Sequence, residues 1–242
     1  MSIINRPLVV MKMGMRQHEA ILSPIMSTVN QALKDGNWTC HKCGVRIPGY
    51  MQIDHIKGHG VQTRESLRPI CVFCHDQDHI IWAAARKRVI PILGPELTNE
   101  QISRLAWSVI SLNKDKEDED ASMAVDNLTG AVRQRHHDFQ KRYGSQDADS
   151  AIEAIFRFLN VEDEETPAMT ERKRRIVEKM EAEMRFVPKL LTGAVIEDPS
   201  ETVSVWRIGG FSFPERTPEE AMEDPGDTAH IISAVNALMA EK

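Results

Sequence analysis

The chain of 242 residues is long enough for one large domain, or for a small core domain with appended elements. Hydrophobic residues make up 41% of the sequence and charged residues 27%, as in ordinary globular proteins, and no apolar run approaches the roughly 18 to 20 residues of a membrane span. A net charge of −6 and a pI near 5.9 argue against a dedicated nucleic-acid binder. The N-terminal segment lacks the apolar core of a signal peptide, so we expect a cytoplasmic protein without membrane insertion.

Residues 1–36 predict an arm followed by a helix. The arm contains Pro7–Val10, which could form an edge strand. The helix is expected over residues 16–34, because four aliphatic side chains recur at intervals of four and would share one face. These are Ile21, Ile25, Val29 and Leu33. Asp35 and Gly36 end the predicted helix.

Residues 37–95 hold all four cysteines, as Cys40-x-x-Cys43 and Cys71-x-x-Cys74 with 27 residues between the pairs. Two such pairs complete the tetrahedral thiolate cage that a closed structural Zn²⁺ site prefers. Four thiolates can also hold iron. Disulfides are less favoured, because CxxC pairs in a cytosolic chain are usually metal or redox sites. The spacing therefore predicts a structural four-cysteine zinc site.

The same region predicts two strands and a helix around the metal. Met51–Ile56 alternates apolar and polar residues as a half-buried strand does, and Leu67–Ile70 is the expected return strand after a glycine-containing turn. A helix is expected after Cys74 and should end before Pro91. Ile90–Leu97, with two prolines and a glycine, predicts a loop.

Residues 96–200 predict a mostly helical region. Thr98 and Gln101 form a capping-box pattern before an amphipathic helix with buried Ile102, Leu105, Ala106, Val109 and Ile110. The charged run Asn113–Asp120 marks a boundary or an exposed turn. Three further helices are expected over Ala121–Tyr143, Ala151–Leu159 and Thr170–Phe186.

Residues 201–242 predict a hairpin around Gly209 and Gly210, a helix start at Thr217, and an amphipathic helix over Thr228–Met239. That last helix can pack on the core of its own chain or serve as a docking surface. The whole pattern predicts an α+β fold, with a small ββα four-cysteine module followed by a mostly helical part.

Two cysteine knuckles that flank Asp54-His55 and close on Cys74-His75 resemble the HNH nuclease module in its four-cysteine form. The resemblance implies that His55 is a general base, and that Asp54 with His75 or His79 holds a catalytic Mg²⁺ or Mn²⁺. The asparagine that orients the base in that family is replaced here by Ser66, whose hydroxyl is shorter than an amide.

A second resemblance extends from about Asn37 to about Pro188. The segments LRPICVFC, LGPELTNEQISRL, NLTGAVRQRHHDFQKRYGSQDADSAIEAIF and MRFVP are similar, in this order, to the IcmJ (DotN) family of type IVB (Dot/Icm-like) secretion systems. It implies an HNH-like zinc fold and a cytoplasmic interaction subunit of a coupling complex. The implied partners are the C-terminal tail of a DotL-like coupling ATPase and the other subunits, which would recruit the chain to the inner membrane.

Three functions are therefore open from the sequence. An interaction subunit fits the negative net charge of the chain and its small number of aromatic residues. A metal-dependent HNH endonuclease fits Asp54, His55 and His75. A zinc module that binds nucleic acid without cleaving it would show strongly salt-sensitive binding, and the acidic balance disfavours it.

Overall fold

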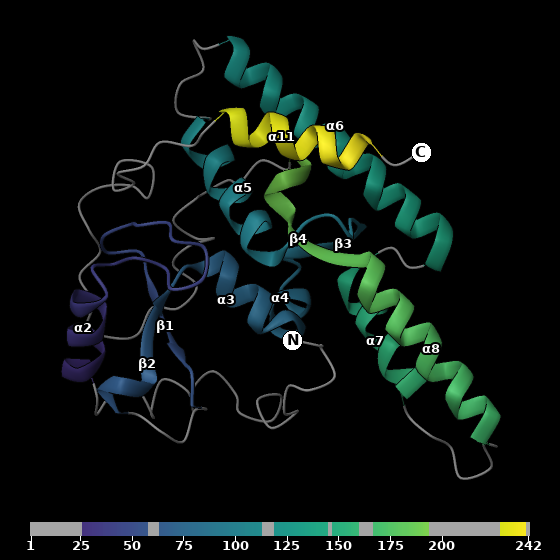
Figure 1. Cartoon of the computed structure of the whole chain (residues 1–242), viewed down its shortest axis with the longest axis horizontal. Helices are drawn as coiled ribbons and strands as arrows, with labels where there is room; N and C mark the ends of the chain where they lie inside the picture. Colours follow the sequence, from purple (N-terminus) through teal and green to yellow (C-terminus); the bar gives the residue numbers. More distant parts are fainter. Residues whose placement is uncertain are drawn as a thin grey trace.

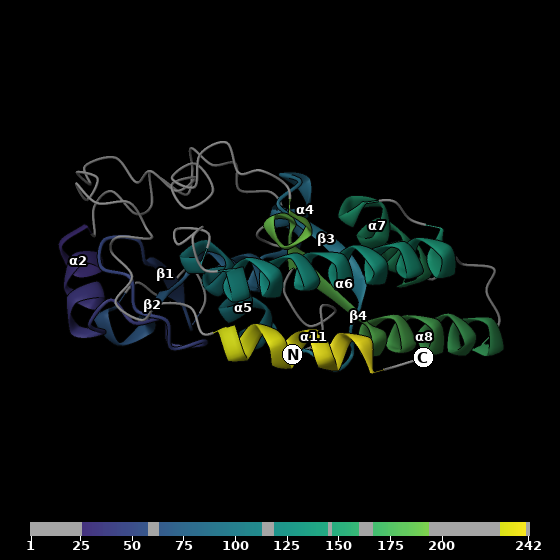
Figure 2. The same cartoon turned by 90° about the horizontal axis from the view of Figure 1, so that it is seen from above.

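The computed structural model describes residues 26–57, 63–112, 119–144, 147–159, 167–193 and 228–240. Within these ranges the chain combines helices and strands, and helices predominate (Figure 1). The cysteine-bearing part with its two strands lies at one end, and long helices extend to the other end (Figures 1 and 2). The predicted mixed fold with a mostly helical C-terminal part is confirmed at this level.

The cysteine-bearing part contains helix α2 (Met26–Asp35), strand β1 (Gln52–His55), strand β2 (Leu67–Ile70) and helix α3 (Val72–Asp78). The two strands pair antiparallel, with Gln52 opposite Ile70 and His55 opposite Leu67. The short 3₁₀ turn η4 (Arg64–Ser66) leads into β2, and Cys71 alone separates β2 from α3. The expected strands and the helix that follows them are therefore present in this order.

Helix α2 packs on β2 and places Val29 and Leu33 in the core, as the four-residue spacing predicts. Gly36 follows the helix at a point of close approach. A Cβ atom at Gly36 would lie 2.3 Å from Cγ of Pro69, so any larger residue would push α2 away from β2. This contact fixes the start of the first cysteine turn relative to the sheet.

A second sheet joins segments far apart in the sequence. Helix α4 (Ile80–Ala85) is followed by strand β3 (Val89–Leu93), which pairs antiparallel with β4 (Met184–Pro188). The sequence predicted a loop from Ile90 to Leu97 and a helix that reaches Phe186. Both predictions are wrong where the strands lie, at residues 90–93 and 184–186. Local patterns cannot show a pairing between segments so distant, and two prolines hide it further.

Both outer edges of this sheet are closed to further strands. In an antiparallel pair, alternate residues direct their backbone N–H and C=O groups toward the partner strand or away from it. The hydrogen bonds from Lys189 N to Arg88 O and from Gly94 N to Glu183 O show which residues face inward. The backbone groups of Pro91, Phe186 and Pro188 therefore point outward. The two prolines lack the N–H that another strand would need. The carbonyl of Pro91 lies 2.7 Å from His136 Nδ1, and that of Phe186 accepts from Gln77 Nε2. The edges are thereby protected against intermolecular pairing.

The helical part begins with α5 (Asn99–Leu112) and continues with α6 (Glu119–Tyr143). The predicted capping box at the start of α5 is confirmed, because Thr98 N donates to Gln101 Oε1 at 2.8 Å and Gln101 N donates to Thr98 Oγ1 at 3.2 Å. Gly144 follows α6 with a φ of 67°, a conformation that favours glycine.

Helix α11 (Thr228–Met239) lies along α6 and also contacts α5 (Figure 1). Its buried face consists of Ile231, Ala234 and Leu238. The guanidinium of Arg135 on α6 donates to the carbonyl of Leu238, through Nε at 2.8 Å and through Nη2. A cation at the last turn also suits the helix dipole. The C-terminal helix therefore packs on the core of its own chain.

The main hydrophobic core is continuous across the predicted regions. It contains Ile53 of the cysteine-bearing part, Leu105 and Leu128 of the helical part, and Ile231 of α11. A second cluster joins α4, the far end of α6, α7 (Ala148–Leu159) and α8 (Pro167–Glu183), with Phe139, Val177 and Met180 buried at its centre.

Several predictions lie outside the described residues: the edge strand at Pro7–Val10, the first turns of the N-terminal helix, the hairpin around Gly209 and the helix start at Thr217. None of the helices in the described part of the chain has the length and apolar character needed to cross a bilayer.

Candidate metal centre

The first cysteine pair lies on a tight backbone turn, the first knuckle (residues 39–46). The backbone N–H of Cys40 donates to Val45 O, and that of Gly44 donates to Cys40 O. Gly44 has a φ of 78°, and a bridge between Thr39 and Arg46 closes the turn. The knuckle thereby brings Cys40 and Cys43 to one side of the loop.

The second pair comes from the junction of β2 and α3. Cys71 is the N-cap residue of α3, and its sulfur accepts a hydrogen bond from the backbone N–H of Cys74 at 3.4 Å. A helix start is a favourable place for a thiolate, because its exposed N–H groups and dipole attract negative charge. One helical turn therefore sets the spacing of Cys71 and Cys74.

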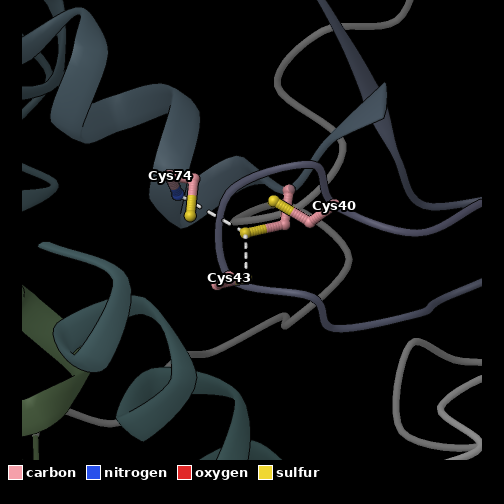
Figure 3. Close-up of side chains that lie close together, drawn as sticks. Cys40, Cys43 and Cys74 are labelled. Carbon is pink, nitrogen blue, oxygen red and sulfur yellow. Dashed lines mark hydrogen bonds between the residues drawn. The ribbon is translucent and has the colours of Figure 1, made fainter. Parts of the chain in front are cut away.

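The four sulfur atoms lie within 4.8 Å of one another, and all four cysteines are buried. Figure 3 shows Cys40 and Cys43 on the knuckle and Cys74 in the first turn of α3, gathered around one small space. The sulfurs of Cys43 and Cys71 are 3.7 Å apart, which excludes a disulfide between them. Four sulfurs about 2.3 Å from a central ion would be about 3.8 Å apart, so the spacing fits a tetrahedral ion. The cluster could hold a metal ion such as zinc.

The electrostatics of the cluster favour a cation at its centre. Hydrogen bonds from Cys43 and the other thiols lower the pKa of Cys40. Burial raises the pKa of Cys71, and interaction with Cys40 and Cys43 raises that of Cys74. The first cysteine to ionise is thus stabilised by hydrogen bonds from the neighbouring thiols. Each further thiolate is disfavoured, because the negative charge already present repels it. A divalent cation removes this conflict, because it compensates the thiolates that it binds.

The side chains between the first two cysteines fasten the knuckle to its neighbours. His41 Nε2 lies 3.0 Å from Asp54 Oδ2 on β1, and Lys42 Nζ donates to Asp78 Oδ1 at the end of α3. Burial tends to raise the pKa of Asp54, but the hydrogen bond with His41 and the nearby basic side chains outweigh it and hold the pKa below 3.8.

The histidines after the last cysteine also have partners near the sheet. His75 Nδ1 lies 2.6 Å from Gln52 Oε1, and the rings of His75 and His79 meet edge to face with centroids 4.7 Å apart. Gln52 and Asp54 are two residues apart on β1 and therefore share a face. The structure thus brings Asp54, His75 and His79 to the same side of the module.

Asp54, His75 and His79 do not form a cluster of three ligands like that of the cysteines. In the described ranges, the four cysteines are the only group of three or more metal-binding side chains whose ligand atoms come this close together. His55 ends β1, half-buried and opposite Leu67. The hydroxyl of Ser66 bonds to the backbone of Thr63, donating to its O at 2.7 Å and accepting from its N at 3.0 Å.

The sequence identified the four cysteines but missed two of their polar neighbours. His41, between the cysteines of the first pair, contacts Asp54 of β1. Gln52 was not singled out, although its place two residues before Asp54 on an alternating strand is a signal that both face the same side.

No protein-family model matches the chain, and no curated protein sequence matches it.

Proposed function

We propose that the chain is a zinc-stabilised cytoplasmic interaction subunit of a type IVB secretion coupling complex, or of a related conjugation complex. In this proposal it binds the C-terminal tail of a DotL-like coupling ATPase, and it reaches the inner membrane through that protein. The partner is suggested by the order of the segments that resemble the IcmJ family, from the first knuckle to MRFVP.

The observation that carries the proposal is the closed cysteine cage. Structural zinc sites use four protein ligands, whereas catalytic sites keep a position open for water or substrate. Here the exposed fractions of Cys40, Cys43, Cys71 and Cys74 are 1%, 8%, 0% and 2%. A buried four-sulfur site supports a scaffold role, because no substrate could reach the ion.

The residues at the hydrolytic positions also support an interaction role. The carboxylate of Asp54 contacts His41, and His75 contacts Gln52. Ser66, at the position of the orienting asparagine, uses its hydroxyl within its own turn. A divalent ion would have to compete with these bonds for its ligands.

The test is co-purification of the zinc-loaded full chain with the C-terminal tail of the matching DotL-like coupling ATPase. We expect a complex that survives gel filtration at micromolar concentration. Absence of binding by folded, metal-loaded protein would contradict the proposal. The matched control is the same tail with its order of residues scrambled.

The alternative is a metal-dependent HNH endonuclease with His55 as the general base. One observation favours it: Asp54, His75 and His79 gather on one side of the module, and His55 directly follows Asp54 in the sequence. A plasmid-nicking assay with Mg²⁺ or Mn²⁺ separates the two functions. Nicking by the wild type that disappears in His55→Ala would support the nuclease, and equal background activity in both proteins supports the interaction subunit.

A further inference from the structure

Helix α6 carries an exposed stripe without charge along the middle of its length. Met123, Asn127, Gly130 and Gln134 recur at intervals of three and four residues, so they share one face of the helix. All four are exposed, and Met123 is 58% exposed although it is apolar. We call these four residues the α6 stripe.

Helix α11 lies along α6 in both views and adds further apolar surface beside it (Figures 1 and 2). Ile232 and Met239 of α11 are 49% and 56% exposed, and their spacing of seven residues places them on one face. The sequence of α11 contains no Asp, Glu, Lys or Arg. A surface helix usually carries charged residues on its exposed side, and their depletion is typical of the centre of a protein interface.

Gly130 indicates that another chain approaches α6 closely. Glycine destabilises the interior of a helix relative to alanine, and α6 has 25 residues with Gly130 near their middle. Its φ is not positive, and a Cβ atom at this position would have no heavy atom within 4 Å in the described part of the chain. The fold of a single chain therefore gives no reason for a glycine here. Close approach of a second helix would give one.

The charges at the two ends of α6 indicate which helix that is. The first turn of α6 contains Glu119 and Asp120, and the last turn contains Lys141 and Arg142. Gly130 lies equally far along the sequence from Glu119 and from Lys141. A second copy of α6 that crosses the first at Gly130 in the opposite direction would therefore bring the acidic start of each helix to the basic end of the other. It would also set the two helix dipoles antiparallel.

The end charges lie on the same face as the α6 stripe. Glu119 comes four residues before Met123, and Lys141 comes seven residues after Gln134, so the helical repeat aligns them with the stripe. Both side chains belong to exposed residues. The order along this face is acidic, uncharged and basic, which is complementary to itself when reversed.

We propose that two copies of this chain associate through α6, about a two-fold axis at Gly130. The glycines of the two helices meet, and each Glu119 pairs with Lys141 of the other copy. Such an interface uses the same patch on both subunits. It extends along a helix of about 37 Å and its flanks, which is small for a permanent dimer, so we expect association in the micromolar range. This inference goes beyond the coupling-complex function and does not require it.

The test is sedimentation velocity of the metal-loaded full chain over a range of concentrations. The average mass should rise from the 27.4 kDa of one chain toward twice that value. Gly130→Gln should weaken the dimer at least about tenfold, because its side chain separates the two helices. Its thermal midpoint should be no lower than that of the wild type, because the side chain points into open space. Ser233→Gln is the matched control, an exposed residue of α11 that points about 100° away from Ile232 and should leave the dimer unchanged.

A charge swap tests the direction of the pairing. Glu119→Lys and Lys141→Glu should each weaken the dimer about fivefold, since each variant replaces two ion pairs of the dimer with like charges. The double variant Glu119→Lys, Lys141→Glu should bind as tightly as the wild type. Failure of the double variant to restore binding would overturn the antiparallel pairing.

A wild-type chain that remains monomeric at about 200 μM would overturn the proposal. So would a dimer that Gly130→Gln leaves intact. If the chain is monomeric and Gly130→Gln instead abolishes co-purification of the ATPase tail, the face belongs to that partner and the proposal is wrong. Sedimentation uses this chain alone, so its failure is distinct from failure of the coupling-complex function.

Discussion

Polar side chains between the cysteines of the first pair connect the metal centre to the neighbouring elements. His41 joins the knuckle to β1 through Asp54, and Lys42 joins it to α3 through Asp78. Both contacts are formed by residues inside one CxxC pair, so the knuckle cannot rotate without breaking them. We infer that these two contacts hold Cys40 and Cys43 in place for the cysteines of α3.

The variant Asp54→Asn tests this contact. It should lower the free energy of unfolding by about 1 kcal/mol, because it removes the charge from a partly buried hydrogen bond. The pKa of Asp54 is lower in the fold than its ordinary 3.8, so the ionised form stabilises the fold above that pH. This contribution is lost as the pH falls below 3.8 toward the folded pKa.

Denaturant unfolding at pH 7 and at acid pH measures the effect, with the exposed Asp126→Asn as control. The difference between the wild type and Asp54→Asn should shrink as the pH falls. An equal difference at both pH values would contradict the role of the charge.

At the scale of the elements, α11 is the one whose attachment depends most clearly on a single side chain. Arg135 binds the last turn of α11 through the carbonyl of Leu238, and Glu96 lies 3.4 Å from the same guanidinium. Glu96 belongs to the segment between β3 and α5. The LGPELT segment therefore links the sheet, α5 and the C-terminal helix.

Replacing Arg135 with methionine should release α11 without unloading the metal. Methionine keeps the apolar stem but cannot donate to the carbonyl of Leu238 or pair with Glu96. We expect backbone amides of residues 228–239 to exchange with solvent at least about tenfold faster, corresponding to a local loss of roughly 1.4 kcal/mol. The control is His137→Ala on the exposed face of α6. Unchanged exchange in Arg135→Met would contradict this account of the docking.

The elements that the sequence predicted correctly are those specified by local signals. The capping residues Thr98 and Gln101 located α5, and the amphipathic pattern over Thr228–Met239 located α11, although its buried face includes Ala234 and leaves Ile232 and Met239 exposed. Strands β3 and β4 were missed because their stability comes from pairing with each other. Pro91 reads as a loop signal, yet it is tolerated because its missing N–H faces the outer edge.

The metal centre likewise has features that local sequence signals predict and features that they do not. Cysteine spacing predicted the cluster, because a CxxC turn places two sulfurs together whatever the rest of the fold does. The contact of His41 with Asp54 and that of His75 with Gln52 were not predictable, since each joins elements whose orientation is set by the packed core.

For the whole molecule, the shared core couples the metal centre to the helices. Cys71 and Cys74 belong to the same buried cluster as Leu105, Leu128 and Ile231. Structural zinc contributes on the order of 10 kcal/mol or more in small domains, comparable to the roughly 5 to 15 kcal/mol of a whole fold. Loss of the ion should therefore destabilise more than the knuckles.

Chelation tests this coupling. Treatment with a strong zinc chelator should lower the thermal midpoint of the full chain, and the helical circular dichroism signal should melt in one transition with the tryptophan fluorescence. Re-addition of Zn²⁺ should restore the midpoint. If the helical signal melts at the same temperature before and after chelation, the metal centre and the helices are energetically separate.

We propose that the four buried thiolates of Cys40, Cys43, Cys71 and Cys74 hold one structural ion. Elemental analysis of the purified full chain, alongside Cys71→Ser, tests it most directly, because serine keeps a helix cap at this position but is a poor zinc ligand. We expect one zinc per wild-type chain, and in the variant loss of the zinc together with a lower thermal midpoint. Well-folded wild-type protein without bound metal would contradict it.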